Sequence, residues 1–399
     1  MKYFFFAAAV CAAAVMALLP APAFCGPWQE VTSMLGDRDA AVVISPDNEI
    51  LFSGSPEKNL VPASTLKLLT ALVSFHHLGP DFRFKTEFYL DSERSLVIKG
   101  YGDPLLVSEE VEKIAQTLAE HLDETSGIVL DDSEFAQNNI PGISAGSFQP
   151  YDAPAGALCV NFNTVNVRKT GTGYISAEPQ TPLLPSVLKK IRDRNVSGQR
   201  ILLSSHNSEN LIYAGELFAY FLAENGVRIS GRIRPGRADP GNDRLIYTHR
   251  SNFSLRETAG LLMEHSNNFI ANQILAAAGA EAYGPPATLE KGVRAAAAYA
   301  KQNLGISPRL VEGSGISRLN RMSAEMFVPV LDAFKPHYTL LPEDNGIYCK
   351  TGTLDGIRNR AGYIEKNGKL YGFAVLINTP GKTAQPVVKK IASVLRQED

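Results

Sequence analysis

Ser64 and Lys67 lie three positions apart in the run 61–75, and together they could supply a nucleophile and its base. Residues at i and i+3 share one helix face, so the amine would stand beside the hydroxyl. A free lysine, with a pKa near ~10.4, is a poor base at neutral pH, and burial has to lower that pKa before the amine can take the serine proton. The neighbouring residues are apolar and predict a buried helix start: Leu66, Leu68, Leu69, Leu72 and Val73. The pattern predicts an activated serine nucleophile.

Two further copies of Ser-x-x-Lys occur in the chain, and their surroundings differ. The copy from Ser55 to Lys58 continues into proline and polar residues, and the copy from Ser186 to Lys189 follows a Pro-rich stretch. Neither copy offers a buried helix start. We therefore expect the chemistry at Ser64 alone.

A second polar group, Ser266-Asn-Asn268, stands at the break between two apolar helices. The first helix is predicted to open at a capping box, 254–257, and the second to run over 269–278. Small polar residues at such a break either point into a shared cleft or cap the second helix, and the sequence leaves both readings open. The same Ser-x-Asn spacing at 205–207 and 208–210 falls in a polar loop.

A third group, Lys350-Thr-Gly-Thr353, lies on a predicted strand near the C-terminus. Gly352 would allow a ligand backbone to approach the strand closely. Lys350, together with the hydroxyls of Thr351 and Thr353, could bind a carboxylate. The tetrapeptide is repeated at 169–172, which we interpret as a surface hairpin turn.

The elements that must position these groups come from both ends of the chain. Residues 40–45 and 49–53 predict a hairpin that leads into the Ser64 helix. Near the other end, three strands and an amphipathic helix are predicted over 346–352, 360–366, 369–378 and 385–395. This order predicts an α+β fold with one antiparallel sheet, closed by both ends of the chain and flanked by helices.

The domain division follows from the same pattern. We expect a catalytic domain made of residues 26–82 and 250–399. Residues 83–249 predict a large, mostly β inserted accessory domain, and from 127 to about 248 the chain is rich in Gly, Pro, Asn and short strands. Within it we expect a helix over 108–122, capped by Ser108, and another over 214–225.

Composition and targeting signals narrow the class of protein further. With 399 residues, 45% hydrophobic, and a net charge of −2, the chain can bury a large core and gives no reason to expect nucleic acid. Residues 1–23 predict a secretory signal, and hence export. Cys159 and Cys349 either pair as a disulfide or remain buried thiols. No metal-ligand spacing occurs, and we expect no cofactor.

Taken in order, Ser64-x-x-Lys67, Ser266-x-Asn268 and Lys350-Thr351-Gly352 resemble the three signatures of the penicillin-recognising serine acyltransferases. The interval of roughly 200 residues between the first two resembles the D-Ala-D-Ala carboxypeptidase/endopeptidase branch, the low-molecular-mass class C penicillin-binding proteins of peptidase family S13. Further stretches are similar to that family: 62–65, 102–104, 131–133, 161–165, 313–318 and 350–362.

The resemblance implies a serine D-Ala-D-Ala carboxypeptidase or endopeptidase of the periplasm or cell envelope, acting on peptidoglycan peptides and acylated by β-lactams. Ser64 would attack the carbonyl between two D-alanines with Lys67 as base, and the N–H groups of Ser64 and Thr353 would form the oxyanion hole. Ser266 would pass a proton to the leaving amine. The remaining implied roles are holding Lys67 and the substrate amide (Asn268), binding the terminal carboxylate (Lys350, Thr351, Thr353), and lining a pocket for the peptide side chain (Arg318, Asp131).

Two rival functions share part of this pattern. A β-lactamase would use the same signatures with fast deacylation, although such enzymes usually have a much shorter interval between the first two motifs. A cell-wall binding protein without catalysis would keep the fold alone. The presence of every catalytic side-chain type argues against the second rival.

Overall fold

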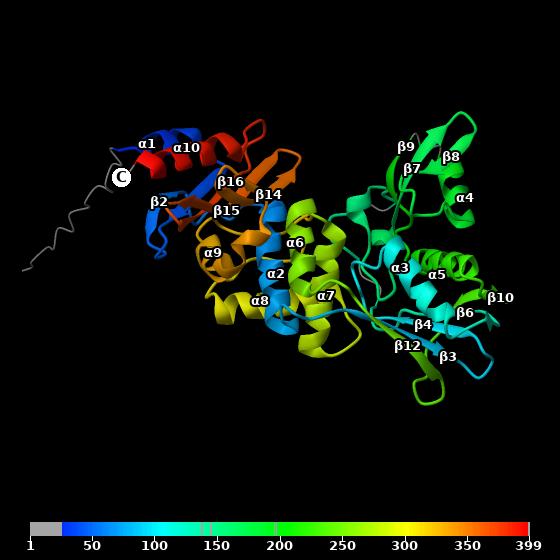
Figure 1. Cartoon of the computed structure of the whole chain (residues 1–399). Helices are drawn as coiled ribbons and strands as arrows, with labels where there is room; N and C mark the ends of the chain where they lie inside the picture. Colours follow the sequence, from blue (N-terminus) through cyan, green and yellow to red (C-terminus); the bar gives the residue numbers. More distant parts are fainter. Residues whose placement is uncertain (1–25, 137–138, 144–145, 195, 197, 398–399) are drawn as a thin grey trace, which may run out of the picture.

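The computed structural model describes residues 26–136, 139–143, 146–194, 196 and 198–397. The predicted export signal, residues 1–23, lies outside the described residues. The described chain forms two lobes (Figure 1). Within these ranges, no helix is both long enough and apolar enough to cross a membrane.

The first lobe is built on a six-stranded antiparallel sheet, as expected from both ends of the chain. Its strands, in spatial order, are β13 (Glu343–Asp344), β14 (Ile347–Leu354), β15 (Ile357–Lys366), β16 (Lys369–Ile377), β1 (Asp39–Ile44) and β2 (Ile50–Gly54). Every residue of β1 is buried, with Val42 facing one hydrophobic cluster and Val43 another. The sheet is therefore covered on both faces.

The two terminal helices cover one face of this sheet (Figure 1). They are α1 (Gln29–Met34) and α10 (Ala384–Gln397), and beside α1 the ring of Trp28 stacks on Phe52 with centroids 5.4 Å apart. Helices on the other side complete the lobe: α2 (Lys67–Leu78), α6 (Leu255–His265), α7 (Asn268–Tyr283), α8 (Leu289–Asn303), α9 (Phe327–Phe334) and the 3₁₀ helix η4 (Lys335–Leu340).

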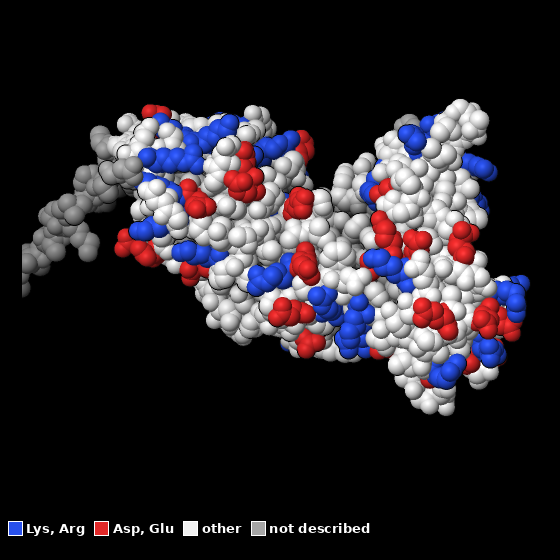
Figure 2. Space-filling model, in the orientation of Figure 1, with Lys and Arg blue, Asp and Glu red and all other residues white. Residues whose placement is uncertain are grey.

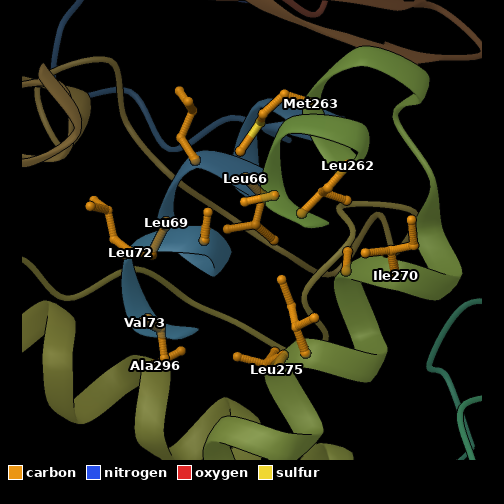
Figure 3. Close-up of a cluster of buried hydrophobic side chains, with 14 of the residues drawn as sticks. Leu66, Leu69, Leu72, Val73, Leu262, Met263, Ile270, Leu275 and Ala296 are labelled. Atoms are coloured by element: carbon orange, nitrogen blue, oxygen red, sulfur yellow. The ribbon is translucent and has the colours of Figure 1, made fainter. Parts of the chain in front are cut away.

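Helix α2 is the centre of this helical layer, and all of its residues from Lys67 to Phe75 are buried. Figure 3 shows Leu66, in the turn just before α2, near Leu262 and Met263 of α6, and Val73 of α2 near Ala296 of α8. The predicted burial of this helix on nearly all sides is confirmed. Its N-terminal end is therefore held rigidly within the lobe.

The second lobe is formed by the segment between α2 and α6 and has its own hydrophobic core (Figure 1). Its main sheet has, in order, β11 (Ile233–Pro235), β6 (Ile128–Asp131), β4 (Leu96–Gly100), β3 (Lys85–Leu90) and β12 (Arg244–Arg250). Helices α3 (Ser108–Ala119) and α5 (Asn207–Glu224) pack their apolar residues into this core. The predicted helix at 214–225 is thus the C-terminal part of a longer one.

Smaller elements complete the second lobe. They are β5 (Glu124–Thr125), β7 (Thr164–Thr170), β8 (Gly173–Ser176), β9 (Gly198–Leu202), β10 (Arg228–Ile229), α4 (Pro185–Arg194) and the 3₁₀ turns η2 (Pro150–Asp152) and η3 (Asn161–Asn163). The second Lys-Thr-Gly-Thr copy forms the β7–β8 turn, so its interpretation as a hairpin turn is confirmed. The predicted cap by Ser108 is wrong, because Ser108 is the buried first residue of α3 and its hydroxyl pairs with Thr181.

Cys159 and Cys349 are buried free thiols, so the disulfide alternative is wrong and the thiol alternative is confirmed. Cys159 belongs to the core around α2, whereas Cys349 packs with α10 on the other face of the sheet. Burial raises the pKa of the Cys159 thiol to about 12. On the face drawn in Figure 2, acidic and basic side chains are interspersed and the surface is hollowed between the lobes.

Candidate active site

Ser64 lies on a short 3₁₀ turn, η1 (Ala63–Leu66), that runs directly into α2. Ala63, the residue before it, is fully buried with φ of 49°, a left-handed conformation that costs a non-glycine residue about 1–2 kcal/mol. Two glycines let other segments approach this strained turn. A Cβ on Gly352 would lie 2.8 Å from the Pro62 carbonyl oxygen, and one on Gly315 would overlap the Ala63 carbonyl. The turn is therefore clamped between β14 and the loop that contains Gly315.

Two buried asparagines of the sheet hold the backbone that precedes the turn. Asn359 on β15 donates to the carbonyls of Val61 and Pro62, both at 2.9 Å. Asn378, just after β16, accepts from the Val61 N–H at 2.9 Å. Asn359 also accepts from the Ile377 N–H, so it ties two strands to the same loop. These contacts position the chain immediately before Ser64.

Removing the Asn359 amide is expected to destabilise the fold. Asn359→Ala leaves the buried Ile377 N–H without its acceptor and removes one of the two donors of each carbonyl, since Asn378 and Thr65 still donate to them. The loss should lower the free energy of unfolding by about 1–3 kcal/mol. Urea denaturation of the purified protein measures the change. Gln302→Ala, at an exposed position of α8, serves as the control and should stay within about 0.5 kcal/mol of the parent. Equal free energies of unfolding for the two variants would contradict the role of Asn359 in holding the backbone before Ser64.

The Lys67 amine lies at the centre of the candidate active site and has three oxygen partners. It lies 2.9 Å from the Ser64 Oγ, 2.8 Å from the Asn268 Oδ1 and 2.7 Å from the carbonyl oxygen of Ser314. Burial, and then the positive charge of Lys350, hold the pKa of Lys67 well below its usual range, while the negative charge of Glu312 opposes the shift. A lowered pKa makes a free amine available near neutral pH, as a base requires.

Both readings of the Ser266-Asn-Asn268 group hold at once. Asn267 caps α7, since its Oδ1 accepts from the Ile270 N–H at 3.2 Å. Asn268 instead points its Oδ1 at Lys67, and its Nδ2 donates to the Tyr151 carbonyl of the second lobe at 3.2 Å. Ser266, in a left-handed conformation with φ of 53°, ends α6. The break between the helices thus supplies both a cap and an active-site group.

A cavity of about 610 Å³ adjoins this break between the two lobes. Ser266, Asn267 and Asn268 form one side of it. Its remaining lining residues come from both lobes: Leu105, Val107, Pro150, Tyr151, Phe162, Thr164, Arg200, Phe253, Leu261, His265 and Ile270. The second lobe therefore contributes directly to the surroundings of Ser266.

Strand β14 presents an open edge beside the Ser64 turn. Its outer neighbour, β13, pairs only with Ile347 and Tyr348, so the edge from Lys350 to Thr353 has no partner strand among the described residues. Lys350 is buried and donates to the Thr351 carbonyl at 3.0 Å, whereas Thr351 and Thr353 are exposed. Burial lowers the pKa of Lys350 to about 8. An open edge of this kind can pair with an extended peptide.

Comparison with known proteins identifies the family. Residues 32–342 match the model of the D-Ala-D-Ala carboxypeptidase 3 (S13) family. The chain belongs to this family. Similar proteins include a D-alanyl-D-alanine carboxypeptidase of Actinomadura sp. (strain R39), 25% identical over 84% of this chain and 77% of the relative. A penicillin-sensitive carboxypeptidase A of Dictyostelium discoideum is 22% identical over 80% of this chain and 76% of the relative. The protein is therefore a hydrolase of the S13 peptidases.

Solved structures show the same fold. Penicillin binding protein 4 of Haemophilus influenzae matches with a TM-score of 0.75 and 19% identity, covering 92% of this chain and 98% of that chain. A predatory peptidoglycan endopeptidase of Bdellovibrio bacteriovorus matches with a TM-score of 0.54 and 15% identity, covering 90% and 92%. These likenesses confirm the expected α+β fold, with its antiparallel sheet and helices.

Of the sequence-predicted site residues of this S13 protein, Lys67 contacts both Ser64 and Asn268 directly, and Gly352 packs on the Ser64 turn. Lys350 acts on the pKa of Lys67 through its charge.

Arg318 and Asp131 have other partners. Arg318 is exposed and donates to the carbonyl of Asp355 at the β14–β15 turn. Asp131 is buried in the second lobe, where its two oxygens accept from the N–H groups of Ser133 and Ala238, each at 2.9 Å. These bonds hold Asp131 within the second lobe, and its expected contact with the peptide side chain stays a prediction.

Sequence reasoning missed Asn359, Asn378 and Glu312, all of which are buried. For Asn359 a signal existed, because it occupies an inward position of β15 between the buried Ile357 and Ala361. A polar residue at an apolar position of a strand marks a specific hydrogen-bonding task. Within the described residues, no group of three or more His, Cys, Asp or Glu side chains is arranged to hold a metal ion.

Proposed function

We propose that Ser64 is the acylated nucleophile of a D-Ala-D-Ala carboxypeptidase/endopeptidase that acts on peptidoglycan stem peptides. The observation that carries the proposal is the buried Lys67 amine 2.9 Å from the Ser64 Oγ, at a pKa lowered by burial and by Lys350. A serine with an adjacent unprotonated amine is an activated nucleophile. S13 membership makes an amide between two D-alanines the expected target.

The reaction proceeds in two halves. In the first, Lys67 takes the proton of the Ser64 hydroxyl while Oγ attacks the carbonyl carbon of the penultimate D-alanine. The N–H groups of Ser64 and Thr353 stabilise the oxyanion. Ser266 passes its proton to the leaving amine and takes one back from the Lys67 ammonium, the C–N bond breaks and the acyl-enzyme remains. In the second half, water attacks the ester carbonyl and releases the shortened peptide, returning the proton to Ser64.

Recognition of the substrate is assigned to β14 and Asn268. The exposed hydroxyls of Thr351 and Thr353, together with the Lys350 ammonium, receive the terminal carboxylate, and Gly352 leaves room for the substrate backbone. Asn268 holds both Lys67 and the substrate amide. β-Lactams carry a carboxylate and a strained amide and should acylate the same serine. A structural relative from Bdellovibrio bacteriovorus is described as penicillin G acylated.

The proposed domain division is a catalytic domain of 26–82 and 250–399 with an accessory domain of 83–249. Its support is that the chain enters and leaves the second lobe on adjacent strands, since β3 and β12 pair from Lys85↔Arg250 onward. The accessory domain also has a separate core. We further propose export to the periplasm or cell envelope through the segment 1–23. Fractionation of cells that express the full chain, beside a variant lacking 1–23, tests this.

Labelling with a fluorescent penicillin tests the assignment of function. The intact protein should take up one label that persists for minutes, mass spectrometry should place it on the peptide that contains Ser64, and Ser64→Ala should remain unlabelled. An adduct on Ser55 or Ser186 would contradict the assignment. Loss of the label within seconds would favour a β-lactamase, and no labelling at all would favour a binding protein without catalysis.

The pKa of Lys350 predicts how activity changes with pH. Below about pH 8 the amine is protonated and can bind a carboxylate, and above it the charge is lost. For a D-Ala-D-Ala peptide, kcat/KM should therefore fall as the pH rises through about 8. Lys350→Arg, which stays charged, should move this fall to higher pH. A substrate with a C-terminal amide is the control, and an identical alkaline fall for it would contradict carboxylate binding by Lys350.

A further inference from the structure

The loop 312–320 is organised around one buried carboxylate. Glu312 is only 1% exposed, and within the described residues it forms no ion pair at contact distance. Its two oxygens instead accept hydrogen bonds from its own loop. The donors are the N–H groups of Ser314 (2.7 Å), Gly315 (2.8 Å) and Ser317 (3.3 Å), the Ser314 hydroxyl (2.5 Å) and the Asn320 amide (2.5 Å). A buried anion is stable only where several donors surround it. The conformation of the 312–320 loop and the negative charge of Glu312 therefore depend on each other.

The same loop is anchored to the helices that carry the site. The Thr70 hydroxyl, one turn after Lys67 on α2, donates to the Gly313 carbonyl at 2.6 Å. The Gly313 N–H donates to the Asn272 Oδ1 on α7 at 2.8 Å. The carbonyl of Ser314, the next residue, accepts from the Lys67 Nζ at 2.7 Å. The loop therefore fixes one of the three oxygen partners of Lys67.

The Ser314 carbonyl helps to decide where the lone pair of Lys67 points. As a free amine, Lys67 has two N–H groups and one lone pair, and it has three oxygens around it. The Ser314 carbonyl and the Asn268 Oδ1 can only accept, so they take the two N–H groups. The lone pair is then left for the Ser64 hydroxyl, which alone among the three can donate. Proton transfer from Oγ to Nζ requires this arrangement.

We propose that Glu312 is a positioning residue for acylation, whose buried carboxylate holds the 312–320 loop so that the Ser314 carbonyl keeps the Lys67 lone pair aimed at Ser64. The inference rests on the proposed roles of Ser64 and Lys67. The groups around Lys67 are the cation Lys350 from β14, the anion Glu312 from the loop and the uncharged Asn268 from α7. Glu312 therefore also supplies the negative charge that balances Lys350.

The experiment measures the second-order rate constant of penicillin acylation between pH 5 and 9. Glu312→Gln should lower it by about 10- to 100-fold, since a misplacement on the order of 1 Å can cost up to about 100-fold. Glu312→Gln should also move the acid limb of the rate–pH profile to lower pH, because the negative charge that favours the Lys67 ammonium is removed. Glu312→Asp keeps the charge and should restore the position of the acid limb.

Thr70→Val is the matched control, since it loosens the same loop without changing any charge. It should lower the rate while leaving the acid limb in place. The proposal is overturned if Glu312→Gln acylates within twofold of the parent, or if Gln and Asp lower the rate equally with the acid limb unmoved. Should Glu312→Gln fail to fold by circular dichroism, Thr70→Val decides, and a parental rate for it overturns the proposal. Persistent labelling of Ser64→Ala would instead overturn the proposed function itself.

Discussion

Lys67→Ala is expected to lower the rate of penicillin acylation by about 10²- to 10⁴-fold, the usual loss when a positioned base is removed. The Lys67 amine is the one nitrogen base that directly contacts the Ser64 hydroxyl among the described residues. Its removal leaves only water to take the proton. Stopped-flow or quench measurement of the acylation rate at pH 7 provides the test, with circular dichroism to establish that the variant is folded.

Lys189→Ala is the control for this prediction. Lys189 belongs to the Ser-x-x-Lys copy at 186–189, is exposed, and lies on α4 of the second lobe. Its removal should leave acylation unchanged. If folded Lys67→Ala acylates at nearly the parental rate, another group deprotonates Ser64 and the proposed mechanism is wrong.

Lys350→Ala is expected to lower kcat/KM for a D-Ala-D-Ala peptide by about 10- to 150-fold. The lost interaction is a charge-assisted hydrogen bond to the substrate carboxylate, worth roughly 1.5–3 kcal/mol at ~1.4 kcal/mol per decade. A second effect of the substitution also lowers kcat/KM. Because the Lys350 charge helps to lower the pKa of Lys67, removing it leaves less free amine at neutral pH.

The duplicated tetrapeptide provides the control for Lys350. Lys169 occupies the matching position of the second Lys-Thr-Gly-Thr, on the exposed β7–β8 hairpin. Lys169→Ala should change kcat/KM by less than twofold. Steady-state kinetics of the two variants side by side decides between the copies, and a large loss at 169 with little at 350 would move the substrate site to the second lobe.

The parts of the site that were predictable from the sequence are those set by local geometry. The Ser64 to Lys67 contact follows from i, i+3 spacing, and the β14 strand follows from its own residues. The hydrogen bond from Asn359 to the Val61 carbonyl joins residues 298 positions apart, and the bond from Lys67 to the Ser314 carbonyl spans 247 positions. No pattern within one segment reports such contacts, because they arise from how the segments pack.

The expectation that Ser108 caps its helix failed for the same reason. Ser108 was assigned a capping role from its place before an apolar run, yet the tertiary environment buries it against Thr181. For Asp131 the expected contact with the peptide side chain stays a prediction, and the structure adds that its oxygens accept from backbone N–H groups of its own lobe. A polar residue can serve either a ligand or the fold, and its neighbours in three dimensions decide which.

The pairing of β1 with β16 determines when the active site can exist during synthesis. The accessory core uses residues between Phe88 and Val227, which leave the ribosome well before the C-terminal strands. Strand β1, apolar from Ala40 to Ile44, has to wait for β16 and the closing helix α10 from the far end of the chain. Domains fold as their residues emerge, so the middle of this chain should fold first. Until β16 and α10 are made, the nascent protein therefore carries an aggregation-prone strand and no assembled nucleophile. Truncation that removes β16 and α10 should abolish both stability and activity.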